Sequence, residues 1–151
     1  MLSKVQLEVE LRKMCKHFNI TQIPEISIVR DLEGRVGYYD FKNNEIVIKE
    51  MKDQEMLAVF YHEFRHLWQK QVYPRLFSMI TRLPTYYTQH YNNVSLEIDA
   101  DEFAGCCLRY PRYWARLSGV AARSDMLDRA ESYLLGCSLS IAGDDQYQDI
   151  S

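Results

Sequence analysis

The sequence has no long apolar run, and this shortage argues against a membrane-spanning helix. No stretch reaches the roughly 18 apolar residues that a membrane-spanning helix requires. Near the N-terminus, apolar residues from Val5 to Leu11 alternate with Lys and Glu, whereas a secretory signal has a continuous apolar core. We therefore expect no membrane partner.

Cysteines are few, and their spacing excludes the common cysteine motifs. The four are Cys15, Cys106, Cys107 and Cys137, and no two of them form a CxxC pair. The adjacent Cys106 and Cys107 suit neither a zinc knuckle nor an easy mutual disulfide. Since the sequence shows no export signal, we expect reduced thiols and a cytoplasmic location.

Linkers and strong charge are also absent. No Ser/Gly-rich or low-complexity segment divides the 151 residues, and 47% apolar content is enough for one core, so a single domain over residues 1–151 is predicted. The net charge is −3, which does not favour nucleic acid as a partner. A basic cluster at Arg109, Arg112 and Arg116 is interpreted as solvated helix surface. The oligomeric state stays open.

What is present is a change of period from helix to strand and back, which predicts an α+β fold. The first helix is expected over residues 2–18, with its apolar stripe on Leu2, Val5, Val9 and Met14. Strand patterns at 26–29, 35–39 and 45–49, joined by tight turns, indicate an antiparallel meander. Further helices are expected at about 54–72, 86–109 and 125–136, with Asp53 and Ser124 as N-caps. Residues 75–84 are ambiguous.

The strongest motif lies in the helix expected at 54–72. His62-Glu63-Phe64-Arg65-His66 is an HExxH pattern, and its two histidines lie one helical turn apart on the same face. Each imidazole can place a nitrogen about 2.0–2.1 Å from one Zn²⁺. Glu63 lies too far round the helix to be a natural ligand, but it can act as general base towards a zinc-activated water. The alternative is a pair of core histidines with no metal.

A catalytic zinc site of this type needs a third protein ligand. Glu97 and Asp101 are four residues apart on the next predicted helix, so both carboxylates face the same way. One can bind the metal while the other accepts the remaining N–H of a ligand histidine. The alternative for this pair is a solvated acidic face.

These motifs resemble a known family. HExxH, then Glu97-Ile-Asp-Ala-Asp101-Glu-Phe103-Ala104 and Leu108-Arg-Tyr-Pro111, is similar to the ImmA/IrrE family of small zincin-like metallopeptidases. The strand region 37–48 is similar to theirs and to that of SprT-like proteins. The resemblance covers roughly residues 23 to 111. It implies a zincin-like fold, in which a small three-stranded antiparallel or mixed sheet packs with the HExxH helix.

The resemblance also implies residue roles. By motif, His62, His66 and Glu97 would bind one Zn²⁺, and Glu63 would be the catalytic base. A similar spacing in thermolysin-like peptidases implies that Asp101 supports a histidine ligand. Members of the family act on cytoplasmic proteins, notably transcriptional repressors, so the expected partner is a protein or peptide substrate.

Some positions depart from the family or stay unassigned. Arg65 is larger and more charged than the residue usual there, and we expect it to point away from the metal, towards acidic partners on the helix surface. Oxyanion donors are not assigned; the aromatic and histidine side chains near the motifs are Tyr38, Tyr39, Tyr86, Tyr87, His90 and Tyr91. Three functions are therefore open: a zinc metallopeptidase, a zincin-like binding module with structural zinc, and a metal-free helical interaction domain.

Overall fold

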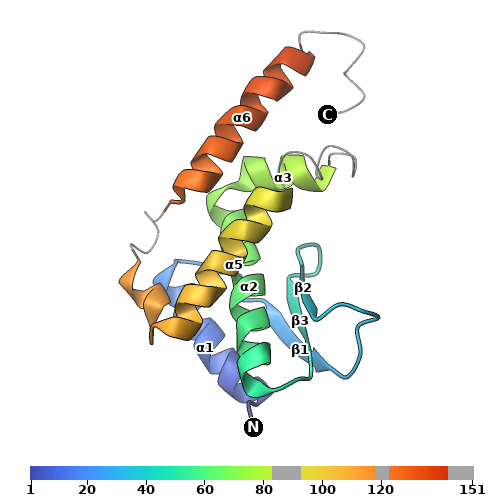
Figure 1. Ribbon diagram of the computed structural model, residues 1–151, viewed down its shortest axis with the longest axis vertical. Helices are drawn as coiled ribbons and strands as arrows, with labels where there is room; N and C mark the ends of the chain where they lie inside the picture. Colours follow the sequence, from blue (N-terminus) through green and yellow to red (C-terminus); the bar gives the residue numbers. More distant parts are fainter. Residues whose placement is uncertain (83–92, 118–122, 143–151) are drawn as a thin grey trace. The chain divides into compact units, whose positions relative to one another are not determined.

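A computed structural model describes residues 1–82, 93–117 and 123–142 and confirms the predicted α+β class (Figure 1). The described residues form five α-helices, one 3-10 helix and three strands. In chain order these are α1 (Lys4–His17), β1 (Glu25–Val29), β2 (Gly37–Asp40), β3 (Glu45–Lys49), α2 (Asp53–Val72), α3 (Pro74–Arg82), α5 (Asn93–Arg109), η2 (Tyr113–Arg116) and α6 (Asp125–Ala142).

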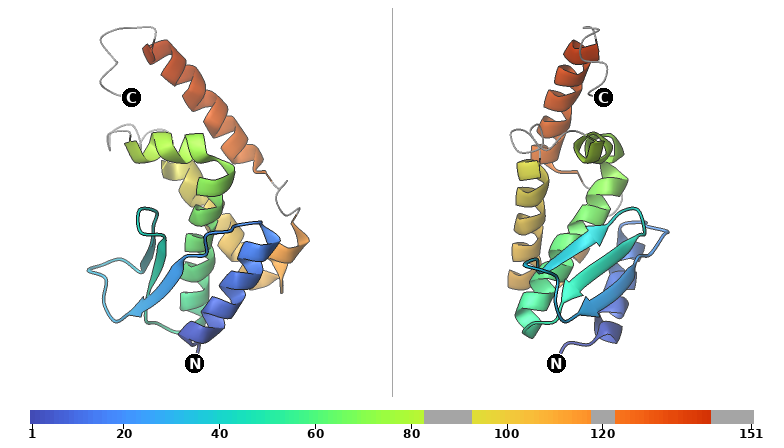
Figure 2. Two further views of the ribbon diagram at one scale, coloured as in Figure 1. Left: turned by 180° about the vertical axis from the view of Figure 1, so that it is seen from behind. Right: turned by 90° about the vertical axis from the view of Figure 1, so that its right-hand side faces the viewer.

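The sheet is mixed, so the predicted meander is wrong. Its strand order is β1-β3-β2, with β3 parallel to β1 and antiparallel to β2 (Figure 2). The connection over residues 30–36 is longer than a two-residue hairpin turn and bends through left-handed backbone at Glu33 and Gly34, so β2 does not fold back directly onto β1. The tight turn at Asn44 instead pairs β2 with β3, and β3 enters between the other two strands.

The chain forms two compact units. The first comprises Met1–Trp68 and Ala100–Ala122, and the second comprises Gln69–Asp99 and Arg123–Ser151. Helices α2 and α5 each contribute residues to both units. The prediction of a single domain remains a prediction.

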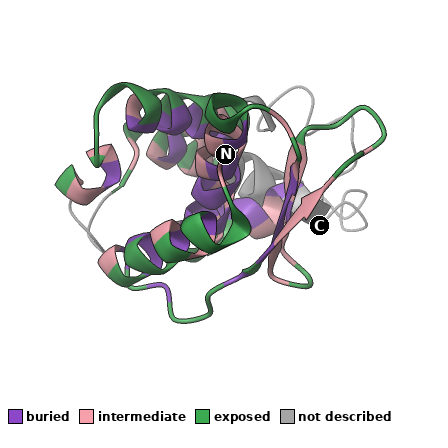
Figure 3. Cartoon of the chain, turned by 90° about the horizontal axis from the view of Figure 1, so that it is seen from below, coloured by how far each residue is buried: buried purple, intermediate pink, exposed green. Residues whose placement is uncertain are grey.

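Helix α1 shows how the first unit forms its core. Ser3 and Gln6 make a capping box that satisfies backbone N–H groups at the helix start. The buried stripe is Leu7, Leu11 and Met14, at i, i+4 and i+7, whereas Val5 and Val9 are exposed. The predicted stripe through the valines is therefore wrong, because the better helical period is the one through the leucines. Figure 3 shows buried residues on one side of the helices and exposed residues on the other.

Helix α2 lies against the sheet and carries the HExxH motif. It begins at Asp53, so Asp53 is the first helical residue and not the predicted N-cap. The N-cap position belongs to Lys52, the residue before Asp53, because its carbonyl accepts the first helical hydrogen bond, from the N–H of Met56. The Asp53 carboxylate instead accepts a hydrogen bond from the backbone N–H of Leu2, at 2.7 Å. The sheet meets α2 at Gly37, where a side chain would collide with Val59.

The second unit contains α3 and α6, which contact each other. The ambiguous segment is a helix that Pro74 opens, a position where proline is favoured. The predicted cap of α6 is confirmed, since Ser124 Oγ accepts from the N–H of Leu127 at 3.3 Å. The N–H of Ser124 donates to the Tyr73 hydroxyl at 2.7 Å, and burial raises the pKa of Tyr73 to about 12.

The ends of two predicted helices differ from the expectation or cannot be compared with it. Helix α6 extends to Ala142, past the predicted end at 136, whereas the start expected for the third helix at 86 lies outside the described residues. In the described part of the chain, no helix combines the length and the apolar character needed to cross a membrane. Cys15 and Cys107 are buried free thiols, and burial raises the pKa of each to about 12.

Candidate metal centre

Two imidazoles of α2 converge on one point. The Nε2 atoms of His62 and His66 lie 3.1 Å apart, and the two rings are nearly perpendicular, with an interplanar angle of 81°. Two nitrogens bound to one tetrahedral zinc ion would stand about 3.3 Å apart at ordinary zinc–nitrogen distances. The observed separation is therefore close to the spacing that a shared cation requires.

The position of these histidines follows from the helical period. Phe60, Phe64 and Leu67 are buried on one side of α2. At 3.6 residues per turn, His62 lies about 200° round the helix from Phe60, so the apolar side anchors the helix while the histidine pair occupies the other side. Both histidine side chains are at least partly buried, which limits the water around their nitrogens.

Asp101 contacts the first histidine. Its Oδ1 atom lies 2.8 Å from His62 Nδ1, with 17% of the His62 side chain exposed and 75% of the Asp101 side chain exposed. A carboxylate at this distance holds the imidazole proton on Nδ1. In the neutral imidazole this leaves the lone pair of His62 on Nε2, the atom that faces His66. The role of Asp101 in supporting a metal ligand remains a prediction.

Glu97 completes a group of possible ligands. It lies on α5 one turn before Asp101, so the unbroken helix presents both carboxylates on the same side. The ligand atoms of His62, His66 and Glu97 all lie within 4.8 Å of one another. Two imidazoles and one carboxylate form a donor set known from catalytic zinc sites. The group could therefore hold a metal ion.

Glu63 lies beside His62 and is 7% exposed. As the next residue of α2, it is rotated by about 100° from the histidine face, so it borders that face without belonging to it. This position suits a residue that lies near a metal ion without being one of its ligands. Its role as general base remains a prediction.

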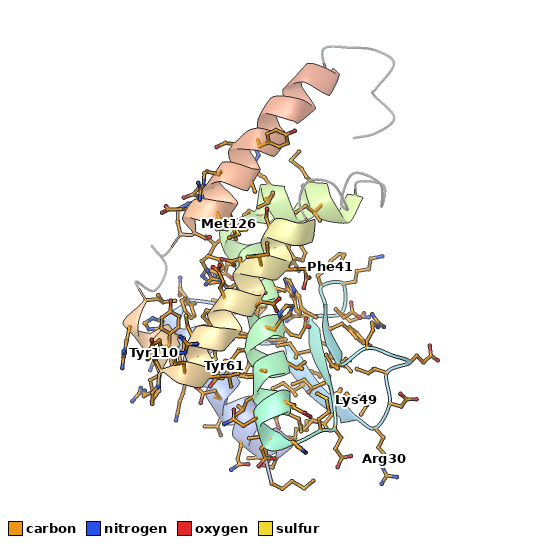
Figure 4. All side chains as sticks on the ribbon, in the orientation of Figure 1. Arg30, Phe41, Lys49, Tyr61, Tyr110 and Met126 are labelled. Carbon is orange, nitrogen blue, oxygen red and sulfur yellow. The ribbon has the colours of Figure 1, made fainter. Side chains whose placement is uncertain are left out.

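Arg65 corrects one expectation. Its side chain is 7% exposed and does not lie on the helix surface. The guanidinium carbon lies 3.5 Å from the centre of the Trp68 ring and 4.9 Å from that of Phe103. A planar, weakly hydrated guanidinium stacks well on aromatic faces, which explains why this cation is accommodated inside. Tyr61, labelled in Figure 4, makes a further ring contact with Phe103.

The sequence analysis missed a buried polar pair. Gln69 is fully buried, and its Nε2 atom donates to the carbonyl of Leu96 and to Oδ2 of Asp99, both at 2.9 Å. Asp99 is only 6% exposed. The available signal was spacing: Gln69 follows His62 by seven residues and His66 by three, so it lies on the histidine face of α2.

Some of the unassigned aromatic and histidine residues near the motifs are described by the structure, and others are not. Tyr86, Tyr87, His90 and Tyr91 lie outside the described residues. The Tyr39 hydroxyl donates to Asn44 Oδ1 at 3.0 Å, and burial raises the pKa of Tyr39 to about 12. Tyr38 stacks under the Arg35 guanidinium, at 4.6 Å. The basic cluster of Arg109, Arg112 and Arg116 is exposed, as a solvated surface should be.

Comparison with known proteins identifies a family. Neither the curated proteins nor the solved structures contain a match to this chain. One family model matches residues 5–102, which is more than half of the chain and includes the HExxH motif, Glu97 and Asp101. The chain therefore belongs to the family described as "Putative metallopeptidase family (DUF6782)".

Proposed function

We propose that this protein is a zinc-dependent peptidase in which His62, His66 and Glu97 are the metal ligands. The observation that carries the proposal is the 3.1 Å separation of the two Nε2 atoms, beside a carboxylate within reach. Zinc at this group would act as a Lewis acid and lower the pKa of a bound water to near neutrality. The membership of a metallopeptidase family supports the same conclusion.

The residues of the chain have separate roles in this proposal. Asp101 keeps the proton of His62 on Nδ1, so that Nε2 stays available as a ligand. Glu63 accepts a proton on its carboxylate from the attacking water and then passes it to the leaving amine. Its low exposure agrees with this role, because few other water molecules can reach a buried carboxylate.

The substrate proposed is a protein segment in extended conformation. Strand β2 lies at an edge of the sheet, since β3 pairs with it on one side only. It begins at Gly37 against Val59, three residues before His62 on α2. An extended peptide could add to this edge through backbone hydrogen bonds, a mode that suits a peptidase. The other edge strand, β1, is in contact with α1.

The finer identity rests on sequence resemblance. A relation to ImmA/IrrE or SprT-like peptidases, a cytoplasmic location and a transcriptional repressor as substrate all agree with the motifs quoted above. We propose no nucleic-acid or membrane partner. Transcription repressors from the same organism are therefore the first candidate substrates to test.

The test is the Glu63→Gln variant, which removes the base and keeps the size of the side chain. We expect it to bind zinc stoichiometrically, as the natural protein does, and to lose cleavage of the repressor. The matched control is Glu55→Gln, an exposed position in the first turn of the same helix, which should cleave normally. Metal content by mass spectrometry and cleavage by gel electrophoresis measure both effects.

Other outcomes select the alternatives. If Glu63→Gln retains the biological effect on the repressor, the protein is a binding module with structural zinc. If the natural protein and His66→Ala contain equally little metal after growth in zinc, the interaction domain without metal is correct. Either result overturns the peptidase.

A further inference from the structure

We infer that the buried pair Gln69–Asp99 positions Glu97, so that its carboxylate can reach a cation held by His62 and His66. The inference rests on the proposed function and deepens it. It concerns two residues outside the HExxH pattern and outside the ligand set.

Both residues of the pair are buried although both are polar. Gln69 is fully buried and Asp99 is 6% exposed, yet both are polar and one is an acid. Burying such groups costs free energy that a pair of apolar side chains would not cost. Because hydrogen bonds alone bring only a modest net gain, stability is a poor reason for this pair, and a need for exact orientation is a better one.

The hydrogen bonds of the pair lead to the turn of α5 that carries Glu97. The Gln69 amide donates to the Leu96 carbonyl and to the Asp99 carboxylate, and these two residues flank Glu97 on α5. Gln69 itself shares a face of α2 with His66, three residues earlier. The turn of α5 that carries the carboxylate ligand is thus tied to the side chain that follows the histidine pair.

The contacts of the pair also bear on the rotation of α5 about its own axis. Asp99 follows Glu97 by two residues, so the two side chains leave α5 about 200° apart. Asp101, in contrast, leaves within about 40° of Glu97 and contacts His62. Contacts on two sides of one helix prevent it from rolling about its axis. If the Gln69 contact is lost, the turn of α5 around Glu97 is held less firmly than the packed turns near Phe103, and the Glu97 carboxylate shifts relative to the imidazoles.

The experiment measures zinc affinity by competition with a chromogenic chelator, using the full-length protein. Gln69→Met keeps the size of the side chain but removes both hydrogen bonds. We expect zinc affinity to fall about tenfold or more, as is usual when a group that orients a ligand is lost. Asp99→Asn keeps an oxygen that accepts from Gln69, so it should bind zinc nearly as well as the natural protein. Asp99→Leu should lower zinc affinity as Gln69→Met does, and it replaces Gln69→Met in the experiment if Gln69→Met does not fold.

Two controls separate positioning from general stabilisation. Tyr73→Phe removes hydrogen bonds to Ser124 and Asp128 in the same unit, so it should lower the melting temperature and leave zinc affinity unchanged. In a Glu97→Ala background, Gln69→Met should produce no further loss of zinc affinity, because the ligand that it positions is already absent. Cobalt in place of zinc should show the same dependence on Glu97. Gln69→Met should change the visible absorption band of the cobalt-loaded protein when Glu97 is present, and should change nothing further in the Glu97→Ala background.

The results are decisive in each direction. If Gln69→Met binds zinc as well as the natural protein, or weakens binding equally with and without Glu97, the positioning role is wrong while the peptidase survives. If the natural protein binds no zinc, the proposed function fails and this inference fails with it.

Discussion

At the scale of the residue, the contact between Asp101 and His62 is the most direct target. Replacing Asp101 by Ala removes the acceptor at 2.8 Å from Nδ1, so His62 can turn or carry its proton on the wrong nitrogen. We expect zinc affinity to fall about 10- to 100-fold, with Asp101→Asn falling less because its oxygen still accepts. Chelator competition measures the change. Glu102→Ala, at the next and also exposed position, is the control that should bind normally.

An unchanged affinity in Asp101→Ala would contradict this role. It would mean that the Asp101 carboxylate, three-quarters exposed, makes only the weak contact that is usual for surface ion pairs.

The residue scale also shows how far the site could be predicted. His62 and His66 could be placed together because the period of a helix fixes residues four apart on one face. Glu97 and Asp101 follow the same rule within α5. Gln69 lies on the histidine face by its spacing, but neither it nor Asp99 was recognised, because a Gln or Asp on a helix resembles any solvated residue until its partner is known. Arg65 was misplaced because a charged residue on a helix is usually solvated, although one aromatic neighbour, Trp68, lies only three residues further along α2.

At the scale of the element, the fit between the sheet and α2 depends on Gly37. A methyl group there would collide with Val59 and would stand 2.8 Å from the carbonyl oxygen of Val47. Neither neighbour yields easily, because one is stiff at χ1 and the other is backbone. We expect Gly37→Ala to lower the free energy of unfolding by about 1–3 kcal/mol.

The matched control for this prediction is Gly105→Ala. Nothing lies near a methyl group at that position within α5, so replacing glycine should stabilise the helix by about 0.5–1 kcal/mol. Urea denaturation measures both variants. If both change stability in the same direction, the close approach of β2 to α2 is not what constrains Gly37.

Elements were easier to predict than their pairing. A strand pattern such as that of Ile26 to Val29 reports the local period but not which strand lies beside it. The length of the 30–36 connection was the missing information, because it decides whether β2 can return onto β1. The helix of residues 74–82 was ambiguous for a related reason: a short apolar run fits both periods, and a proline such as Pro74 can follow the end of one helix as well as open the next.

At the scale of the whole molecule, the two compact units share the helices that carry the proposed ligands. His62 and His66 lie on α2 and Glu97 on α5, and each helix continues through both units. A ligand that binds the folded chain and not the unfolded chain stabilises it by mass action. Zinc should therefore act on the unfolding of both helices and not only on the residues around the proposed ligands.

This reasoning gives a thermal prediction. At a free zinc concentration about a hundredfold above the dissociation constant, binding contributes about 2.7 kcal/mol. In a chain of this length each kcal/mol raises the melting temperature by about 2–4 °C, so we expect a rise of about 5–10 °C in calorimetry, reversed by a chelator. His66→Ala should show no such rise, because one imidazole and one carboxylate hold zinc only weakly. If the chelator leaves the melting temperature of the natural protein unchanged while zinc is shown to be removed, then the imidazole pair and Glu97 do not share a cation in the folded state, and the structural basis of the peptidase is lost.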